Sequence, residues 1–230
     1  MDLNRAKLTD EQEEQPKGVS VLAVSWKQIK ELINLLRYER YIDDQWQIDE
    51  VWKICEALCR REELQQEPWE VRRKVLSDIM ENDYYDYYGC GDPTGDLSKK
   101  LCVTKQEYLA LADIMDRTYH SREAADLYHK YGRDDKYVSY LEDNLGKKSE
   151  IYIELMNYYR EQEDFENSRR VAEQALVKCR DNLTEIFIYL LEDAKEKGDK
   201  DKYNKLYASA KRRRGADINW IDRALINQEV

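Results

Sequence analysis

Residues 151–180, IYIELMNYYREQEDFENSRRVAEQALVKCR, contain two amphipathic segments that predict the fold of the chain. In the first segment, large apolar and aromatic side chains recur at the spacing i, i+3, i+4 and i+7, from Tyr152 to Tyr159. In the second segment, small side chains at Ser168, Ala172 and Ala175 mark one face. This periodicity predicts two helices that pack against each other.

The same stripe occurs before and after this helix pair. It lies 44 residues earlier and 35 residues later, on Tyr108, Leu111, Ala112 and Met115, and on Phe187, Leu190, Leu191 and Ala194. Ala124 and Tyr128 mark the expected partner helix of the earlier stripe, and the longer first interval leaves room for a short extra helix at about 135–145. Helix pairs repeating at about 34 residues must stack on one another to bury their apolar faces. We therefore expect a helical array over 101–230, closed by a last helix at 218–226.

The unit at 152–180 resembles a tetratricopeptide repeat, a helix-turn-helix module that stacks into solenoids. The slots of that family's pattern hold Tyr152, Leu155, Met156, Tyr159, Phe165, Ser168, Ala172 and Ala175. Met156 stands where the family has a small residue, Ala172 stands where it has an aromatic residue, and no unit ends in proline. The resemblance implies an all-α fold, a tetratricopeptide-like helix-pair solenoid preceded by an N-terminal helical segment.

The resemblance also implies a function in recognition, because the first helices of such pairs line a groove that holds a peptide or a partner segment. The residues that would face this groove are Asp113, Asp116, Asn157, Arg160, Glu192 and Lys195. Their mixed charge favours a polar, extended ligand, although the same residues would suit an ordinary solvated helix face. We predict a non-catalytic interaction or scaffold module with a protein or peptide partner. Reversing Arg160 and Lys195 to Glu should then abolish partner binding without unfolding the protein.

The N-terminal part is expected to contain three helices at 20–81, preceded by a mobile polar tail at 1–19. The first helix carries an apolar stripe of Trp26, Ile29, Leu32, Ile33 and Leu36. Ser25 is the expected N-cap of this helix. Pro68 suits the first turn of the third helix, where its missing N–H group is tolerated.

Residues 82–100, NDYYDYYGCGDPTGDLSKK, are predicted to form an acidic, tyrosine-rich loop, because glycine and proline concentrate there. The aspartates Asp83, Asp86, Asp92 and Asp96 could supply oxygen ligands for Ca²⁺, although their spacing does not match an EF-hand. The tyrosines Tyr84, Tyr85, Tyr87 and Tyr88 favour either a partner-binding surface or packing against neighbouring helices. The alternative function is therefore a metal-dependent enzyme or module that uses this loop, and a third interpretation is a regulatory subunit of a larger assembly.

Cysteine and histidine give weak signals for catalysis or metal binding. Cys55 and Cys59 lie on one helical face, but free cysteine is often buried, which favours a role in the core. His120 and His129 have no Ser or Cys nearby in a nucleophile context. The sequence has no glycine-rich phosphate loop, nucleophile elbow or paired zinc motif. It therefore leans against an enzyme, and we predict no catalytic residue, metal or cofactor.

Charge and composition narrow the partners and the compartment. The 38 Lys and Arg residues against 48 Asp and Glu give a net charge of −10, which argues against nucleic acid or an anionic membrane as the main partner. The basic run at 211–214 suits the end of a helix better than a phosphate site, because cations complement the helix dipole there. Scattered cysteines, with no signal peptide and no membrane-length apolar stretch, predict a cytoplasmic protein. Homodimerisation through an exposed end of the array is a further expectation.

Overall fold

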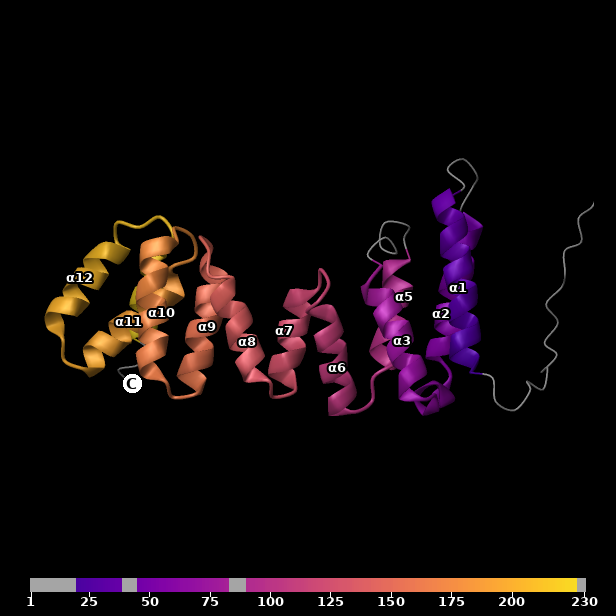
Figure 1. Cartoon of the computed structure of the whole chain (residues 1–230). Coiled ribbons are helices and arrows are strands. Elements are labelled where there is room, and N and C mark those ends of the chain that lie inside the picture. The colour runs from indigo at the N-terminus through magenta and orange to yellow at the C-terminus, as the bar shows by residue number, and fades with distance from the viewer. Residues whose placement is uncertain (1–19, 39–44, 83–89, 227–230) are drawn as a thin grey trace, which may run out of the picture. The chain divides into compact units, whose positions relative to one another are not determined.

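The computed structural model describes residues 20–38, 45–82 and 90–226. Within these residues the chain forms twelve α-helices and one 3₁₀ helix, and no β-strand (Figure 1). The predicted all-α fold class is therefore confirmed. The chain divides into two compact units, 1–127 and 128–230, which are described separately.

The helices follow one another closely in both units. The N-terminal unit contains α1 (Val21–Tyr38), α2 (Gln45–Cys59), η1 (Glu62–Gln66), α3 (Trp69–Met80), α5 (Gly91–Lys100), α6 (Lys105–Met115) and most of α7 (Ser121–Lys130). The C-terminal unit contains the end of α7, then α8 (Asp134–Asp143), α9 (Ser149–Glu161), α10 (Phe165–Lys178), α11 (Thr184–Glu196), α12 (Lys200–Ala210) and α13 (Ile218–Ile226). The helices expected at about 135–145 and at 218–226 are present as α8 and α13.

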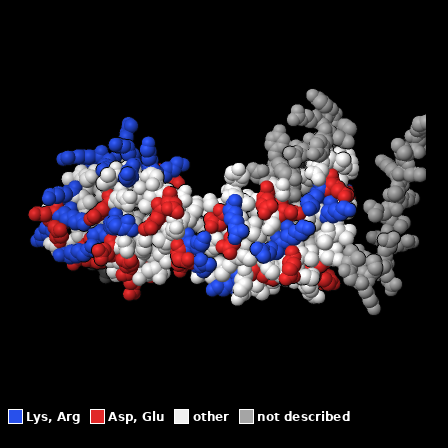
Figure 2. Space-filling model, in the orientation of Figure 1, with Lys and Arg blue, Asp and Glu red and all other residues white. Residues whose placement is uncertain are grey.

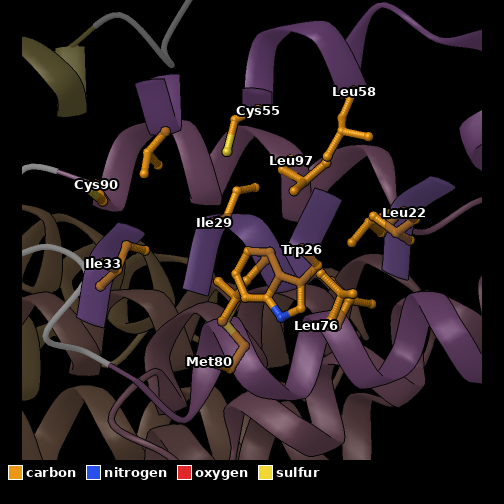
Figure 3. Close-up of a cluster of buried hydrophobic side chains, with 14 of the residues drawn as sticks. Leu22, Trp26, Ile29, Ile33, Cys55, Leu58, Leu76, Met80, Cys90 and Leu97 are labelled. Carbon is orange, nitrogen blue, oxygen red and sulfur yellow. The ribbon is translucent and has the colours of Figure 1, made fainter. Parts of the chain in front are cut away.

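One apolar cluster forms the core of the N-terminal unit. The predicted stripe of α1 is buried along its whole length: Trp26, Ile29, Leu32, Ile33 and Leu36. Figure 3 shows the Trp26 ring beside Leu76 and Met80 of α3, with Leu97 of α5 in the same cluster. Burial of side chains of this size stabilises the fold by about 1.5–3 kcal/mol each. The 3.6-residue period therefore identified this face of α1 correctly.

The start of α1 differs from the prediction. The helix begins at Val21, and the Ser20 hydroxyl accepts a hydrogen bond from the N–H of Ala23 (3.0 Å). Ser20 is therefore the capping residue, and Ser25 lies inside the helix. Pro68 directly precedes the first residue of α3, Trp69, so it lies at the predicted helix start.

The predicted acidic loop is wrong over 91–100, where the chain forms α5. Pro93 is the third residue of this helix, a position whose N–H group would have no partner within the helix, so proline removes no hydrogen bond. The hydroxyl of Thr94 donates to the carbonyl of Cys90 (2.7 Å), and that of Ser98 to the carbonyl of Gly95 (2.7 Å). Polar residues typical of a turn thus satisfy their hydrogen bonds inside a helix.

The predicted domain limits stay predictions. The compact units meet at 127/128, whereas the sequence placed the start of the array at 101. The predicted tail at 1–19 lies outside the described residues. The same holds for two of the candidate metal ligands and for the four clustered tyrosines: Asp83, Asp86, Tyr84, Tyr85, Tyr87 and Tyr88.

A buried ion pair joins α3 to α6 in the N-terminal unit. Arg72 is 5% exposed, and its two terminal nitrogens donate to the two carboxylate oxygens of Glu107 at 2.9 and 2.6 Å. The same guanidinium also donates to the carbonyls of Leu101 (2.6 Å) and Glu67 (2.9 Å). Arg72 therefore has hydrogen-bond partners on several sides, as a buried charge requires.

Glu107 is held equally firmly. Its carboxylate accepts hydrogen bonds from the N–H groups of Val103 (2.7 Å) and Thr104 (3.2 Å), and the Thr104 hydroxyl accepts from the N–H of Glu107. Thr104 and Glu107 thus form a capping box at the start of α6. The hydrogen bonds from Arg72, together with those from the backbone, outweigh the effect of burial and lower the pKa of Glu107 from 4.5 to about 2.

In the C-terminal unit, each helix from α8 to α11 packs on the next one along the chain, and contacts also join every second helix. Arg170 of α10 donates to Glu142 of α8 (3.3 Å). Lys202 of α12 donates to Glu173 of α10 (2.7 Å). On the other side, α11 packs on α13, and a hydrogen bond joins α9 to α11. The helices α8, α10 and α12 therefore form one row, and α9, α11 and α13 form another.

The last helix, α13, was predicted to present Trp220, Ile221 and Leu225 as one apolar face. Ile221 is fully buried and Leu225 is 8% exposed, whereas the Trp220 side chain is 60% exposed. The packed face of α13 thus contains two of the three residues.

Three turns of the C-terminal unit share the same backbone hydrogen bonds. A residue with positive φ occurs in each of them: Gly132, Glu163 and Gly198. The N–H of the following residue donates to the carbonyl five positions earlier, from Arg133 to Tyr128 (2.7 Å), from Asp164 to Tyr159 (2.9 Å) and from Asp199 to Ala194 (2.9 Å). The positive-φ residues donate to the carbonyls three positions earlier at 3.1, 3.1 and 3.0 Å. Each turn is a Schellman motif that separates α7 from α8, α9 from α10 and α11 from α12.

The position of these turns bears on the predicted helix pairing at the start of the array. The sequence paired the helix of Tyr108 with the helix of Ala124 and Tyr128. The structure instead places the first of the three matching turns after Tyr128, so that the repeated connection joins α7 to α8. The short helix expected as an insertion thus follows a turn of the same type as those that precede α10 and α12.

Candidate binding surface of the C-terminal unit

The six residues predicted to face a groove are divided between the two units. They are Asp113 and Asp116 in the N-terminal unit, and Asn157, Arg160, Glu192 and Lys195 in the C-terminal unit. Asp113 lies on α6 and Asp116 directly follows this helix, and both side chains are exposed. The remaining four lie on α9 and α11, so the candidate surface is built on these two helices.

Asn157 connects α9 to α11. Its side-chain nitrogen donates to a carboxylate oxygen of Glu185 at 2.7 Å. Asn157 is half-buried, whereas Arg160, one helical turn further along α9, is exposed. Asn157 therefore holds the two helices side by side, and Arg160 presents its charge to solvent.

A hollow of about 680 Å³ lies where the α9–α10 turn faces the C-terminal half of α11, and we call it the turn hollow. It is lined by Arg160, Glu161, Glu163, Phe165, Arg169, Tyr189, Glu192, Asp193, Glu196 and Lys197. The structure thus brings Arg160 and Glu192, two of the predicted residues, to one site. Sequence analysis did not single out the other charged residues of the turn hollow.

Asp193 pairs with two cations on one side of the turn hollow. Its carboxylate accepts hydrogen bonds from Arg169 (3.0 Å) and from Lys197 (2.6 Å). Burial raises the pKa of Asp193, but the hydrogen bond from Lys197 and the charges of both cations outweigh burial and keep the pKa below its usual value. Arg169 and Lys197 are therefore already partnered within the protein.

The other side of the turn hollow is acidic. Glu161, Glu163 and Glu196 are exposed, and within the described residues none of them forms an ion pair. Beneath them the Tyr189 ring is 7% exposed, and its buried hydroxyl has no hydrogen-bond partner among the described residues. A buried hydroxyl without a hydrogen-bond partner destabilises a fold by about 1–3 kcal/mol. The Tyr189 hydroxyl next to the turn hollow therefore does not stabilise the fold through a hydrogen bond with another described residue.

Phe165 is the exposed aromatic residue among those that line the turn hollow. It is the first residue of α10 and is 52% exposed. The corresponding positions of the two matching turns hold Asp134 and Lys200. The turn itself therefore does not require an aromatic residue. An exposed aromatic ring beside charged side chains is typical of the anchor of a protein–protein interface.

Lys195 lies in a different hollow from Arg160. This end hollow, of about 620 Å³, is lined mainly by α12 and α13, including Tyr203, Tyr207 and Leu225. The Tyr207 hydroxyl donates to Asp222 at 2.7 Å, and this hydrogen bond raises the pKa of Tyr207. Reversal of Arg160 and Lys195 together therefore changes two hollows, so each must be varied separately.

A third hollow, missed by sequence analysis as a site, is basic. This basic hollow, of about 730 Å³, is lined by Arg180, Lys205, Ala208, Ser209, Arg212, Arg213 and Arg214. Figure 2 shows Lys and Arg side chains gathered along the edge of the C-terminal unit where α12 ends and the chain turns toward α13. The run at 211–214 was visible in the sequence, but Arg180 joins it only in the folded chain.

The described residues show no arrangement of side chains that supports the predicted metal-dependent alternative. Asp92 and Asp96 lie on α5, and Asp96 accepts a hydrogen bond from Lys99 (2.8 Å). No group of three or more His, Cys, Asp or Glu side chains is arranged for a metal ion within the described residues. The metal-dependent alternative thus stays a prediction, since half of its proposed ligands lie outside these residues.

Four of the five cysteines are buried, and Cys59 is half-buried. Cys55 is 1% exposed within the cluster of Figure 3, and burial, aided by nearby Cys59 and Cys90, raises its pKa to about 12. Burial also raises the pKa of Cys90 to about 11. Thiols with such pKa values are protonated at neutral pH and are poor nucleophiles. His129 pairs with Asp134 (2.9 Å) and stacks on Tyr137 at a centroid distance of 4.4 Å.

Comparison with known proteins adds no assignment: no family model, no curated protein and no solved structure matches the chain. The tetratricopeptide resemblance therefore stays a proposal, supported by the structure only at the level of helices packed in adjacent pairs. In the part of the chain that the structure describes, no helix combines the length and the apolar character needed to cross a membrane.

Proposed function

We propose that the chain is a non-catalytic interaction module, built on tetratricopeptide-like helix pairs, that holds a segment of a partner protein in the turn hollow. One observation carries the proposal. Phe165 is exposed at a position where the two matching turns have charged residues. An exposed aromatic side chain that the turn does not require, lining a hollow, is best explained by a ligand.

The repeated geometry of the C-terminal unit supports the repeat-module part of this proposal. The Schellman turns centred on Gly132, Glu163 and Gly198 recur at intervals of 31 and 35 residues. Two rows of helices with contacts between neighbours are what stacked helix pairs produce. Such arrays expose one helix of each pair along a continuous face, and proteins of this kind use that face for binding.

The charges of the turn hollow indicate the chemistry of the partner segment. Asp193 is already neutralised by two cations, which leaves Glu161, Glu163 and Glu196 to attract positive side chains. The segment that fits best is extended, carries Lys or Arg, and places one apolar side chain against Phe165. This description of the partner segment is more specific than the polar, extended ligand expected from the sequence.

The direct test replaces Phe165 with Ala and compares it with Val177→Ala, which removes an 80% exposed apolar side chain of the same helix outside the turn hollow. Proteins that co-purify with the wild type and with Val177→Ala, but not with Phe165→Ala, are candidate partners. Their affinity, measured by calorimetry, should fall about 30-fold with Phe165→Ala, as for an interface anchor worth about 2 kcal/mol. Equal recovery with all three proteins contradicts the proposal.

A charge test addresses the acidic side of the turn hollow. The double variant Glu161→Lys and Glu196→Lys should weaken binding and reduce its salt dependence, because the attraction for a basic segment is lost. The matched control, Asp143→Lys and Glu150→Lys, changes the net charge equally at exposed positions outside the turn hollow. If the control weakens binding as much as the test variant, the turn hollow is not the site.

A further inference from the structure

The geometry of the basic hollow points to a second ligand site, and we infer that it binds a phosphorylated peptide segment. The site lies at the ends of α10 and α12 and shares no lining residue with the turn hollow. It goes beyond the proposed function, and either site can fail without the other.

The positive charge of the basic hollow is not compensated by carboxylates among the described residues. Five cationic side chains line the basic hollow and no acidic side chain does. Within the described residues none of the five forms an ion pair with a carboxylate, although the chain carries ten more acidic than basic side chains. Like charges placed together repel one another, so a cluster of this kind in an acidic protein needs a compensating group.

Helix ends supply only a small part of that compensation. The hollow lies where α10 and α12 end, and Arg213 donates to the carbonyl of Cys179 at the end of α10 (3.5 Å). The C-terminus of a helix carries roughly half a negative charge, so two helices offset about one of the five positive charges. The helix-dipole interpretation, favoured from the sequence, therefore explains the presence of one or two cations and leaves the others available to a ligand.

Hydrogen bonds within the protein hold the walls of the basic hollow in place without a ligand. The carbonyl of Gly215 accepts a hydrogen bond from the N–H of Leu183 (2.6 Å), and the N–H of Asp217 donates to the Thr184 hydroxyl (2.9 Å). Gly215 packs so closely that a Cβ there would lie 2.5 Å from the carbonyl oxygen of Arg180. These contacts bring Arg180 to the loop of Arg212–Arg214 and fix their separation.

The side chains that line the basic hollow favour phosphate over other anions. Four of the five cations are arginines, whose planar guanidinium groups bind phosphate through paired hydrogen bonds. Ala208 and Ser209 add small side chains to the wall, which leaves room for a phosphate group between the arginines. A phosphorylated side chain brings about −1.5 to −2 charges to one point, which matches a compact cluster better than a single carboxylate does.

Nucleic acid fits the site less well. Single strands are bound along extended basic grooves with aromatic side chains for base stacking, and the basic hollow has no aromatic lining residue. The net charge of −10 opposes a long polyanion but acts little on a short, locally neutralised segment. Peptide recognition through clustered arginines is the mode that these features match.

The experiment measures fluorescence anisotropy of a labelled peptide that carries one phosphoserine between acidic residues, titrated with the full chain. The phosphorylated peptide should bind at least about tenfold more tightly than the same peptide without phosphate. The variant Arg212→Glu with Arg214→Glu should remove this difference. Both side chains are exposed, and half-buried Arg213 is left intact, so the fold should be retained, as circular dichroism can verify.

Three further variants keep the test sharp. Lys147→Glu with Lys148→Glu changes the charge equally at exposed positions outside the hollow and should leave binding within about twofold. Arg212→Lys with Arg214→Lys keeps the charge but loses paired hydrogen bonding, and should bind at an intermediate level. If the double glutamate variant fails to fold, Lys205→Glu on the other wall provides the same test.

Several results would overturn the inference. One is equal affinity for the phosphorylated and unphosphorylated peptides. Another is equal loss of binding with the Lys147 and Lys148 control, which would show attraction to the surface as a whole. A third is tighter binding of a single-stranded oligonucleotide of matched charge, which would assign the hollow to nucleic acid.

Discussion

Arg72 of the N-terminal unit and the arginines of the basic hollow in the C-terminal unit are used in opposite ways. In the N-terminal unit, Arg72 is buried and bonded to a carboxylate and two carbonyls. In the C-terminal unit, Arg212 and Arg214 are exposed in a cluster of cations with no paired carboxylate among the described residues. The same side chain stabilises the fold in one unit and is available to a ligand in the other. The two roles differ in whether a carboxylate of the protein compensates the charge of the guanidinium group.

The largest effect on stability is expected at Arg72. Arg72→Ala leaves Glu107 buried without its partner, and should destabilise the N-terminal unit by about 3–5 kcal/mol. Urea unfolding followed by tryptophan fluorescence measures this, since four of the five tryptophans, Trp26, Trp46, Trp52 and Trp69, lie in that unit. The control Arg73→Ala removes an exposed arginine of the same helix and should change stability by less than about 0.5 kcal/mol. Similar effects of the two variants would refute the role given to the buried pair.

Acid should weaken the N-terminal unit through the same pair. Because Arg72 and the backbone hold the pKa of Glu107 at about 2 in the folded state, below the usual 4.5, the folded state binds this proton less readily than the unfolded state. The stabilisation is therefore complete above pH 4.5 and is lost as the pH falls toward 2. Glu107→Gln should be less stable at neutral pH and should show a smaller loss between pH 5 and pH 3. Parallel pH profiles for the two proteins would contradict this assignment.

A smaller effect is expected where Gly215 packs on Arg180. Gly215→Ala places a Cβ against the Arg180 carbonyl and should destabilise the C-terminal unit by about 1–3 kcal/mol, as overpacking does. Because the basic loop must move, phosphopeptide affinity should fall as well. Gly146→Ala, where a Cβ would meet its nearest atom at 3.8 Å, is the control. Thermal unfolding and anisotropy on the same samples measure both effects.

The smallest effect on stability is expected at the basic hollow. Arg212→Glu with Arg214→Glu removes repulsion and should leave the stability of the C-terminal unit unchanged or raise it by up to about 0.5 kcal/mol. Thermal unfolding at low and high salt measures the change, and any gain should disappear in high salt. A clear destabilisation would mean that these arginines serve the fold as Arg72 does.

The sequence predicted helices and their buried faces correctly where the apolar pattern lay within a single helix. The apolar stripes of α1, α9 and α11 were identified from periodicity alone, because each face is made of residues within a few turns of one another. It failed at α5, where Gly91, Pro93 and Gly95 are typical of a loop. This segment is helical because Leu97 is buried against other helices, and the local sequence pattern contains no information about that packing.

The sites show the same limit more strongly. Arg72 and Glu107 are 35 residues apart, and Arg180 and Arg214 are 34 apart, so their proximity arises only from helix packing. Arg160 and Glu192 of the predicted groove line one hollow and Lys195 lines another, and the groove itself stays a prediction. Phe165 was assigned to packing by its place in the repeat, and only its exposure in the structure indicates another role.

Hydrogen–deuterium exchange of the full chain, with and without a partner recovered through Phe165-dependent purification, tests the central claim most directly. The account predicts slower exchange at 160–169 and 189–197, the two segments that line the turn hollow, with little change in the N-terminal unit. Protection confined to the N-terminal unit, or unchanged exchange in both segments at saturating partner, would contradict the assignment of this protein as an interaction module that binds through the turn hollow.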